Sequence, residues 1–190
     1  MQRRHILSLL ASPVLVALAA PLVVAQHSAG PARALADIAK ATVIVEGNGQ
    51  RLLTIFFDPN CPYCHALYKD LRPEVGKNGL QFRWVPVAIL TPSSLTKAAA
   101  LLQAADPLQA FRDNEDNWNF GDSPGGGITP AKDVLPATRA KIDANNALLQ
   151  SAGSFGVPTL LWRNTQGKVM MQVGPPDNGK ALRDLLRSIG

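Results

Sequence analysis

The chain has 190 residues, 46% of them hydrophobic, with 19 basic and 14 acidic side chains and a net charge of +5. This length and apolar content suffice for one domain with a substantial core. The positive excess is mild, and no basic run is interleaved with aromatic residues, so nucleic acid is not expected as a partner.

Residues 1–25 are typical of a cleavable secretory signal. Arg3 and Arg4 precede an apolar stretch from Ile6 to Val24, and a small residue, Ala25, marks the expected cleavage site. An uncleaved membrane anchor is the alternative, because the stretch is long enough to span a bilayer. Cleavage would leave 17 basic and 14 acidic residues, a net charge of +3.

Two β-rich segments follow a short lead over residues 26–41, which contains a predicted helix at Ala32–Lys40. Ala41–Glu46 is rich in β-branched residues and predicts a strand. Gly47–Gln50 predicts a hairpin turn into Leu52–Phe57, an unbroken apolar run of strand length. Such a run is typical of a parallel strand that is buried on both faces.

Both cysteines of the chain lie directly after this run, in the motif Cys61-Pro-Tyr-Cys64. Asp58–Asn60 forms a predicted turn, and Pro62 can begin a helix without losing a needed N–H. Apolar side chains then recur on one face of that helix, at Cys64, Leu67, Tyr68 and Leu71. The predicted order is therefore strand, tight turn, dithiol and helix.

The position of each cysteine on this helix predicts its chemistry. Cys61 lies at the helix start, where free N–H groups and the helix dipole stabilise a thiolate, the attacking form of cysteine. Cys64 lies one turn further in, on the apolar face, and should resolve a mixed disulfide from within. His65 is four residues from Cys61, and together with Pro62 it is a possible modulator of the thiolate. We expect its side chain, however, to be solvated beside Lys69 and Arg72.

The spacing of the two cysteines favours catalysis over structural stabilisation. In an exported protein a lone cysteine pair would by default form a structural disulfide. A disulfide that closes a two-residue gap constrains almost no loop and therefore stabilises little.

The remainder of the chain predicts one more parallel strand, a helical segment and a closing hairpin with a helix. Leu80–Val87 alternates large apolar with polar residues and completes a βαβ unit. Residues 93–152 are mainly helical, with a long loop at Trp118–Leu135 and a last helix that ends at Gly153. Strands at Thr159–Arg163 and Lys168–Val173 flank a turn. The final helix has Asp177 as its expected cap, and its buried stripe is predicted at Leu182, Leu185, Leu186 and Ile189.

These segments resemble a known family. The runs FFDPNCPYCHALYKDLRP and VGPPDNGKALRDLL and the turn Gly156–Thr159 are similar to periplasmic thiol:disulfide interchange proteins of the DsbC/DsbG type, and the Cys-Pro-Tyr-Cys motif points toward DsbG. The resemblance covers residue 42 to the end. It implies an α/β thioredoxin-like fold over residues 42–190, with a helical insertion at about 93–152 between the βαβ unit and the C-terminal hairpin plus helix.

The resemblance also implies roles for individual residues. Cys61 would attack the substrate and Cys64 would resolve the mixed disulfide. Pro158 would be a cis-proline beside the dithiol, and Val157 before it would pair with the substrate backbone. Tyr63 is added as a substrate-binding residue.

This chain departs from the family in two respects, and it differs from thioredoxin and DsbA in a third. Residues 26–41 are too short for the family's N-terminal dimerisation domain, so a monomer or weak dimer is expected. Val157 replaces the threonine that is common before the cis-proline, which is closer to the DsbA pattern. Ile55 stands where thioredoxin and DsbA have a buried acid, so no buried carboxylate is expected to accept the proton of Cys64.

Three other interpretations of the motif remain open. Cys61, Cys64 and His65 match the C-x-x-C-H pattern of c-type haem attachment, although no distal ligand is placed. A zinc site on the same residues would lack a fourth ligand. A non-catalytic periplasmic binding or holdase module would carry the cysteines only as a disulfide.

The favoured hypothesis is a periplasmic thiol:disulfide oxidoreductase whose dithiol is the redox centre, with no metal or organic cofactor. Its expected substrates are exported proteins with disulfides or oxidised cysteines, and a membrane redox protein is its expected partner. The direction of electron flow depends on the reduction potential, which sequence does not give.

Overall fold

The structure is a computed structural model that describes residues 29–121 and 125–190, so the predicted signal at residues 1–25 lies outside it. In the described part, a five-stranded sheet has the order β1-β3-β2-β4-β5. The strands are β1 (Ile44–Gly47), β2 (Arg51–Phe57), β3 (Leu80–Pro86), β4 (Thr159–Arg163) and β5 (Val169–Val173). The α-helices are α1 (Ala29–Ala36), α2 (Pro62–Leu71), α3 (Ser94–Gln103), α4 (Pro107–Asp116), α5 (Pro136–Ser151) and α6 (Gly179–Ser188), and short 3-10 helices follow α1 at Ile38–Lys40 and α2 at Arg72–Glu74. None of the helices in these two ranges is long and apolar enough to cross a membrane.

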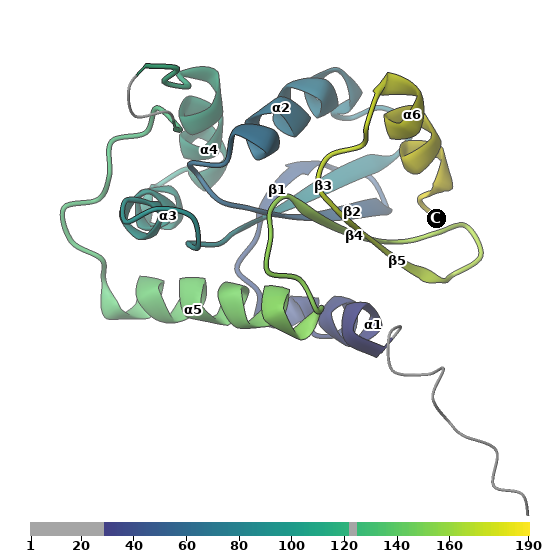
Figure 1. Cartoon of the computed structure of the whole chain (residues 1–190), viewed down its shortest axis with the longest axis horizontal. Coiled ribbons are helices and arrows are strands. Elements are labelled where there is room, and N and C mark those ends of the chain that lie inside the picture. Colours follow the sequence, from purple (N-terminus) through teal and green to yellow (C-terminus); the bar gives the residue numbers. More distant parts are fainter. Residues whose placement is uncertain (1–28, 122–124) are drawn as a thin grey trace, which may run out of the picture.

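Helices cover both faces of the sheet, as Figure 1 shows, with α2 and α6 on one side and α1 and α5 on the other. The alternation of β2 explains this arrangement, because successive side chains of a strand point to opposite faces. Leu53, Ile55 and Phe57 join the core that includes residues of α2, α4 and α6. Phe56 joins the second core, which includes residues of α1 and α5. The central strand is therefore buried on both faces, as its unbroken apolar run predicts.

The βαβ unit and the closing hairpin agree with the sequence. β2 pairs parallel with β3, and Ile55 lies opposite Trp84. β4 pairs antiparallel with both β2 and β5, and α3, α4 and α5 follow one another between β3 and β4. The α/β thioredoxin-like fold with a helical insertion is confirmed.

The predicted hairpin between the first two strands is wrong. β1 pairs antiparallel with β3 instead, so β3 separates β1 from β2. Gly49 lies so close to Gly79 that a Cβ atom at Gly49 would overlap the Gly79 carbonyl group. The glycine-rich segment thus passes the start of β3 at close quarters rather than reversing the chain between paired strands.

The cap of the last helix is shifted by one residue from the prediction. Asn178, not Asp177, precedes α6, and its Oδ1 accepts hydrogen bonds of 3.0 Å from the N–H groups of Lys180 and Ala181. The apolar stripe is as predicted, since Leu182, Leu185, Leu186 and Ile189 are all buried.

Candidate active site

The turn between β2 and α2 is organised by the buried carboxylate of Asp58. Its Oδ1 accepts hydrogen bonds from the Asn60 N–H (2.9 Å) and the Ser94 hydroxyl (2.7 Å), and its Oδ2 accepts from the N–H groups of Ile89 (2.8 Å) and Leu90 (3.1 Å). The side chain is fully buried. It therefore ties the active-site turn to the segment after β3 and to the start of α3.

Lys97 of α3 also holds this turn, through the side-chain oxygen of Asn60. The Lys97 Nζ donates to Asn60 Oδ1 at 2.8 Å and to the Gly126 carbonyl at 2.6 Å. Burial lowers the pKa of this ammonium group. Because Asn60 immediately precedes Cys61, these bonds fix the direction in which the chain enters α2.

Cys61 is the N-cap residue of α2, and its surroundings favour the thiolate. Its Sγ accepts a hydrogen bond of 3.1 Å from the Cys64 N–H. The pKa of the Cys61 thiol is lowered, above all by a hydrogen bond from the Cys64 side chain and further by the N–H groups of Cys64 and Tyr63. Burial and the charge of Asp58 act in the opposite direction. The balance agrees with the anion-stabilising character of a helix N-terminus.

Cys64 lies on the inner face of α2 and has the opposite electrostatic balance. Burial raises the pKa of its thiol well above the ordinary value, and the Cys61 sulfur and the charge of Glu115 act in the same direction. Solvent exposure does not separate the two cysteines, because each side chain is about 1% exposed. They differ instead in how deeply the sulfur is desolvated and in the hydrogen bonds and charges around it.

The turn before β4 faces the first sulfur. The Val157–Pro158 peptide bond is cis, as predicted. The Cys61 Sγ lies 3.6 Å from the Val157 carbonyl oxygen, although the two residues are 96 positions apart in the sequence. Pro158 is buried and Val157 is half-buried, while the Thr159 hydroxyl donates to the Gly156 carbonyl at 2.7 Å. The structure thus brings Cys61, Cys64, Val157 and Pro158 together.

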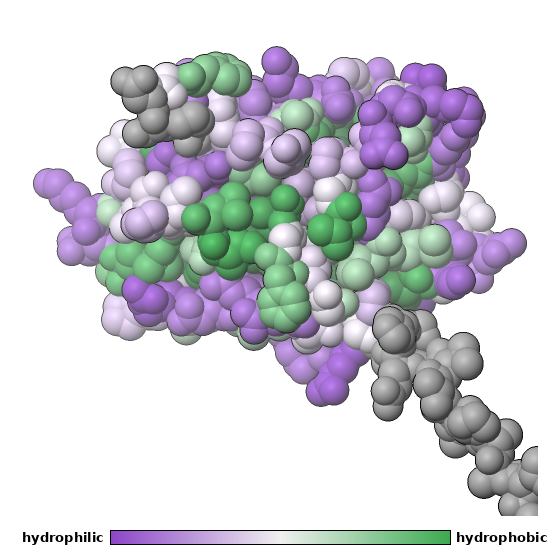
Figure 2. Space-filling model, viewed as in Figure 1, coloured by the Kyte–Doolittle hydropathy of each residue, from purple (hydrophilic) through white to green (hydrophobic). Residues whose placement is uncertain are grey.

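Apolar side chains are exposed around these segments. Pro62 is exposed, and Tyr63 beside it is 65% exposed. Ile89 and Leu90 lie in the segment held by Asp58, and Phe155 precedes the cis-proline turn; all three are exposed. Figure 2 shows a hydrophobic patch on the face seen in Figure 1, in the band between α2 and α5.

The expectation of a solvated His65 is wrong. The side chain is about 9% exposed and stacks on the Trp118 ring, with a centroid distance of 4.6 Å. Its Nδ1 lies 3.2 Å from the Oε2 of Glu115 on α4. The partners come from residues about 50 positions further along the chain, so the local sequence around His65 does not reveal them.

A buried carboxylate whose charge acts on Cys64 does exist, on α4 rather than at position 55. Glu115 is 1% exposed, and its Oε1 accepts a 3.0 Å hydrogen bond from the Asn114 side chain. Burial raises the pKa of Glu115, against the lowering effect of its bonds with His65 and Asn114. Position 55 on the central strand is Ile, whereas this acid comes from the helical insertion.

The zinc and haem interpretations of the motif find no support in this geometry. Outside the undescribed residues 1–28 and 122–124, no group of three or more His, Cys, Asp or Glu side chains is arranged to hold a metal ion. The His65 Nδ1 faces a carboxylate, and the ring stacks on Trp118 and meets Phe120 edge-on. Both cysteines are buried within a packed core, so haem attachment would require the site to open.

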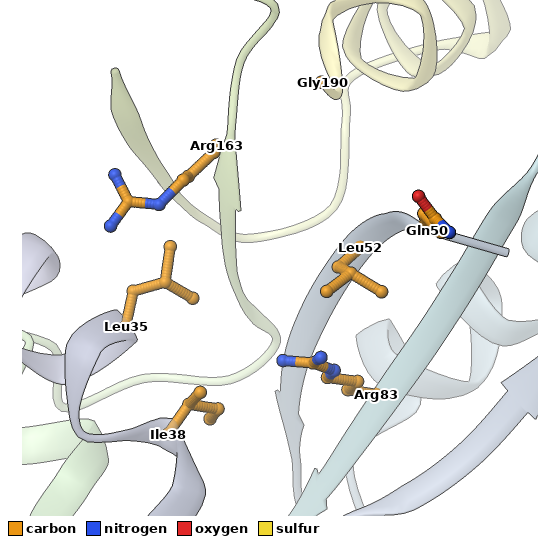
Figure 3. A pocket seen from close by; sticks show the side chains of 7 residues that line it. All are labelled: Leu35, Ile38, Gln50, Leu52, Arg83, Arg163 and Gly190. Carbon is orange, nitrogen blue, oxygen red and sulfur yellow. The ribbon is translucent and has the colours of Figure 1, made fainter. Parts of the chain in front are cut away.

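A hollow of about 230 Å³ lies elsewhere on the molecule (Figure 3). Leu35, Ile38 and Leu52 form its apolar lining, and Arg83 and Arg163 also border it. Leu52 is at the start of β2, about 17 Å along the strand from Phe57 at 3.3–3.4 Å per residue. The hollow is therefore separate from the dithiol.

A buried parallel strand, a Cys-X-X-Cys pair at the start of the next helix and a cis-proline turn whose Val157 carbonyl faces the first sulfur define the class of thioredoxin-like dithiol proteins. A family model described as a thioredoxin-like domain matches residues 38–189. The chain belongs to the thioredoxin-like domain family.

Relatives within this family have narrower names. The chain is 32% identical over 126 residues to the thiol:disulfide interchange protein DsbG of Pseudomonas aeruginosa, covering 66% of this chain and 47% of that protein. It is 27% identical over 129 residues to the Escherichia coli DsbG, covering 66% and 49%. The chain thus spans about half the length of the curated relatives it matches. The resemblance to the DsbC/DsbG type is confirmed.

Solved structures give the same fold. A disulfide interchange protein from Neisseria gonorrhoeae matches with a TM-score of 0.54 and 26% identity, covering 79% of this chain and 95% of that one. A Proteus mirabilis ScsC structure in a transitional conformation matches with a TM-score of 0.63 and 16% identity, covering 84% and 78%. At this identity the second match concerns the fold alone.

Proposed function

We propose that this protein is a thiol:disulfide oxidoreductase that exchanges disulfides with exported proteins through Cys61 and Cys64. The observation that carries the proposal is the placement of the two sulfurs: the Cys61 Sγ caps α2 and lies 3.6 Å from the Val157 carbonyl oxygen of the cis-proline turn, whereas Cys64 lies one turn further in, on the buried face of the helix. The lowered pKa of Cys61 and the raised pKa of Cys64 agree with this placement. The names of the DsbG and DsbC relatives support the same activity.

The reaction has two steps. The Cys61 thiolate attacks one sulfur of a substrate disulfide, the substrate S–S bond breaks, and a mixed disulfide forms as one substrate thiolate leaves. Cys64 then attacks Cys61, the mixed disulfide breaks, and the second substrate thiolate leaves. The dithiol has lost two electrons and the substrate disulfide has gained them. The reverse sequence oxidises a substrate dithiol.

On this proposal, the substrate binds to the surface around Cys61. The Val157 backbone faces Cys61 and can pair with an extended substrate segment, and the exposed Tyr63 ring can cover it. The exported, periplasmic location rests on the signal-like residues 1–25. A membrane redox partner and a monomeric or weakly dimeric state belong to the same proposal, and light scattering of the mature protein tests the latter.

Catalysed reduction of insulin by dithiothreitol tests the activity, with the turbidity of the released chains as the readout. The wild-type protein should accelerate the reaction, and Cys61→Ser should return it to the uncatalysed rate. Cys64→Ser should accumulate a mixed disulfide through Cys61, which non-reducing electrophoresis and mass spectrometry detect. Retained catalysis in Cys61→Ser, or a mixed disulfide at Cys64 in that variant, would refute the proposal.

A further inference from the structure

The hollow of about 230 Å³ in Figure 3 lies on the face of the sheet that packs against α1 and α5. Leu52 is four residues before Phe56 on β2, and Arg83 is two residues before Val85 on β3, so each pair points to one face. Phe56 and Val85 belong to the core that includes residues of α1 and α5. Leu52 and Arg83 are only half-buried, so they lie at the margin of this core.

The opposite wall of the hollow comes from the segment that precedes the sheet. Leu35 lies near the end of α1, Ile38 begins the following 3-10 helix, and both are half-buried. Figure 3 shows these two side chains facing Leu52 and Arg83 across the hollow, with Arg163 above Leu35. Because Arg163 is exposed, the hollow opens to solvent on that side. Three aliphatic side chains therefore surround a space that the Arg83 side chain enters from the sheet.

The Arg83 guanidinium has no acceptor of its own. Among the residues that the structure describes, it forms neither an ion pair nor a hydrogen bond. Thr54 lies opposite Arg83 in the register of β2 and β3, and its buried hydroxyl also has no partner in that part of the chain. Asp37, which lies in the segment of the opposite wall, is paired with Lys40 at 2.8 Å. An acceptor from outside the chain would therefore complete the polar contacts of this face.

A second arginine-lined hollow, of about 420 Å³, shows what a structural arginine looks like in this protein. Arg51 donates to the backbone carbonyls of Ile189 (3.0 Å) and Asn78 (2.9 Å), so it holds a helix end and a turn in place. Glu74 adds a negative charge to the lining of that hollow. Arg83 has no comparable structural contact, and its hollow has aliphatic walls.

The size and the chemistry of the smaller hollow define the ligand that it fits. Its volume is below the range of about 300–1,000 Å³ that is typical of small-molecule sites, so the ligand should be smaller than a drug-sized molecule. A guanidinium group matches a carboxylate, with which it can form two parallel hydrogen bonds. Aliphatic walls favour an apolar group on the same ligand, because its burial removes apolar surface from water. Arg163 adds a second positive charge, since only its bond to the Gly167 carbonyl (3.1 Å) occupies its donors.

We propose that this hollow binds a small organic carboxylate with a short apolar group, in which Arg83 holds the carboxylate and the aliphatic walls hold the apolar group. The site is separate from the dithiol, and the inference goes beyond the proposed function. The C-terminal residue of a peptide has the same chemistry as a free organic acid, and the experiment separates these two sources.

Titration of the ¹⁵N-labelled protein with phenylacetate, followed by amide chemical shifts, measures both the affinity and the position of binding. Saturable shifts should appear at Leu35, Ile38 and Leu52. Phenylacetate should bind at least about tenfold more tightly than its neutral isostere phenylacetamide, because only the anion forms charge-assisted hydrogen bonds with a guanidinium group. It should also bind at least about tenfold more tightly than acetate, which carries the charge without the ring.

Variants of Arg83 test the assignment of the carboxylate contact. Arg83→Met keeps an apolar stem and should weaken phenylacetate binding at least about tenfold, whereas Arg83→Lys keeps a charge without the planar fork and should lie between this variant and the wild type. Arg139→Met makes the same change of charge at an exposed position of α5 and should stay within about twofold of the wild type. The rate of insulin reduction should be unchanged in Arg83→Met, so binding at this hollow and the proposed activity can fail separately.

Equal affinities for phenylacetate and phenylacetamide in the wild-type protein would overturn the proposal without any variant. Shifts confined to the surface around Tyr63 and Val157 would also overturn it, since they would place the ligand at the proposed substrate surface. The same holds for unchanged affinity in an Arg83→Met variant whose amide spectrum shows a folded protein. Shifts at the hollow with N-acetyl-Ala-Phe but none with phenylacetate would assign the site to a peptide C-terminus instead of a free organic acid.

Discussion

The two ends of helix α2 bury polar groups of different kinds. At its C-terminal end, the buried Glu46 of β1 accepts hydrogen bonds from Arg72 (3.2 Å), Arg112 (3.0 Å) and the Trp84 indole (3.2 Å). Guanidinium and indole groups do not lose a proton in this setting. At the N-terminal end the buried groups include two thiols, an imidazole and the carboxyl groups of Asp58 and Glu115, all of which can exchange protons.

The difference shows that burial alone does not distinguish a structural polar group from a chemical one. Glu46 and Glu115 are each 1% exposed, yet one has permanent cations as partners and the other has an imidazole. Tyr68 follows the structural pattern: burial first, and then its 2.9 Å hydrogen bond to Asp116, raise the pKa of its hydroxyl and keep it neutral. The hydrogen-bond and ionic partners of a buried polar group therefore indicate whether its role is structural or chemical.

The largest effect is expected from a change at the C-terminal end of α2, where the buried polar groups are structural. Glu46→Gln removes the charge that compensates Arg72 and Arg112, and loss of one member of a buried ion pair typically costs about 3–5 kcal/mol. Because both arginines are partly exposed, we expect about 3 kcal/mol of lost unfolding free energy. Urea unfolding measures this loss, and the surface variant Asp133→Asn should stay within about 0.5 kcal/mol of the wild type. The rate at which Cys61 reacts with Ellman's reagent should be unchanged. A fall in that rate would show that a change at the C-terminal end of α2 also affects its N-terminal end.

A second effect is the pH dependence of stability at the reactive end. The pKa of Cys61 is lower in the folded protein than in the unfolded chain, where it is about 8.5. At pH values between these two pKa values, the unfolded chain therefore binds more protons than the folded protein. The reduced wild type should therefore gain stability relative to Cys61→Ser as pH rises through the folded pKa, with the full gain present above the unfolded pKa. Urea unfolding of both reduced proteins at several pH values measures the difference. A constant or falling difference would contradict a stabilised thiolate.

The smallest effect is expected at the surface of the reactive end. Tyr63 is 65% exposed, so Tyr63→Ala should change unfolding free energy by no more than about 0.5 kcal/mol. Loss of its contact with substrate should raise KM for insulin a few-fold and leave kcat nearly unchanged. Phe155→Ala is a matched change at an 80% exposed aromatic residue before the cis-proline turn. A large fall in kcat in Tyr63→Ala would assign the ring to the chemical step.

Patterns that depend on neighbouring residues were predictable from the sequence. The apolar run of β2, the inner face of α2 and the stripe of α6 appear where periodicity places them, because each reports burial of the element itself. The position of Cys61 at a helix start also follows from local signals, chiefly Pro62 and the turn before it. Pro158 is cis, as the resemblance implied.

Features that depend on distant partners were not predictable in this way. The environment of His65 is supplied by Glu115 and Trp118, and periodicity on α2 says nothing about either. The turn signal at Gly47–Gln50 indicates a change of direction but not the strand with which β1 pairs. Position 55 of β2 is Ile, and the buried Glu115 is supplied by α4, a distant part of the chain.

The central claim is that two adjacent buried sulfurs differ in acidity and therefore in role. Its most direct test is the alkylation rate of each cysteine in the reduced protein as a function of pH, with iodoacetamide and mass spectrometry of the separated peptides. Cys61 should react first, with a midpoint below the free value of about 8.5, and Cys64 should remain unmodified until far higher pH. Equal rates at both sulfurs with an ordinary midpoint would contradict the account.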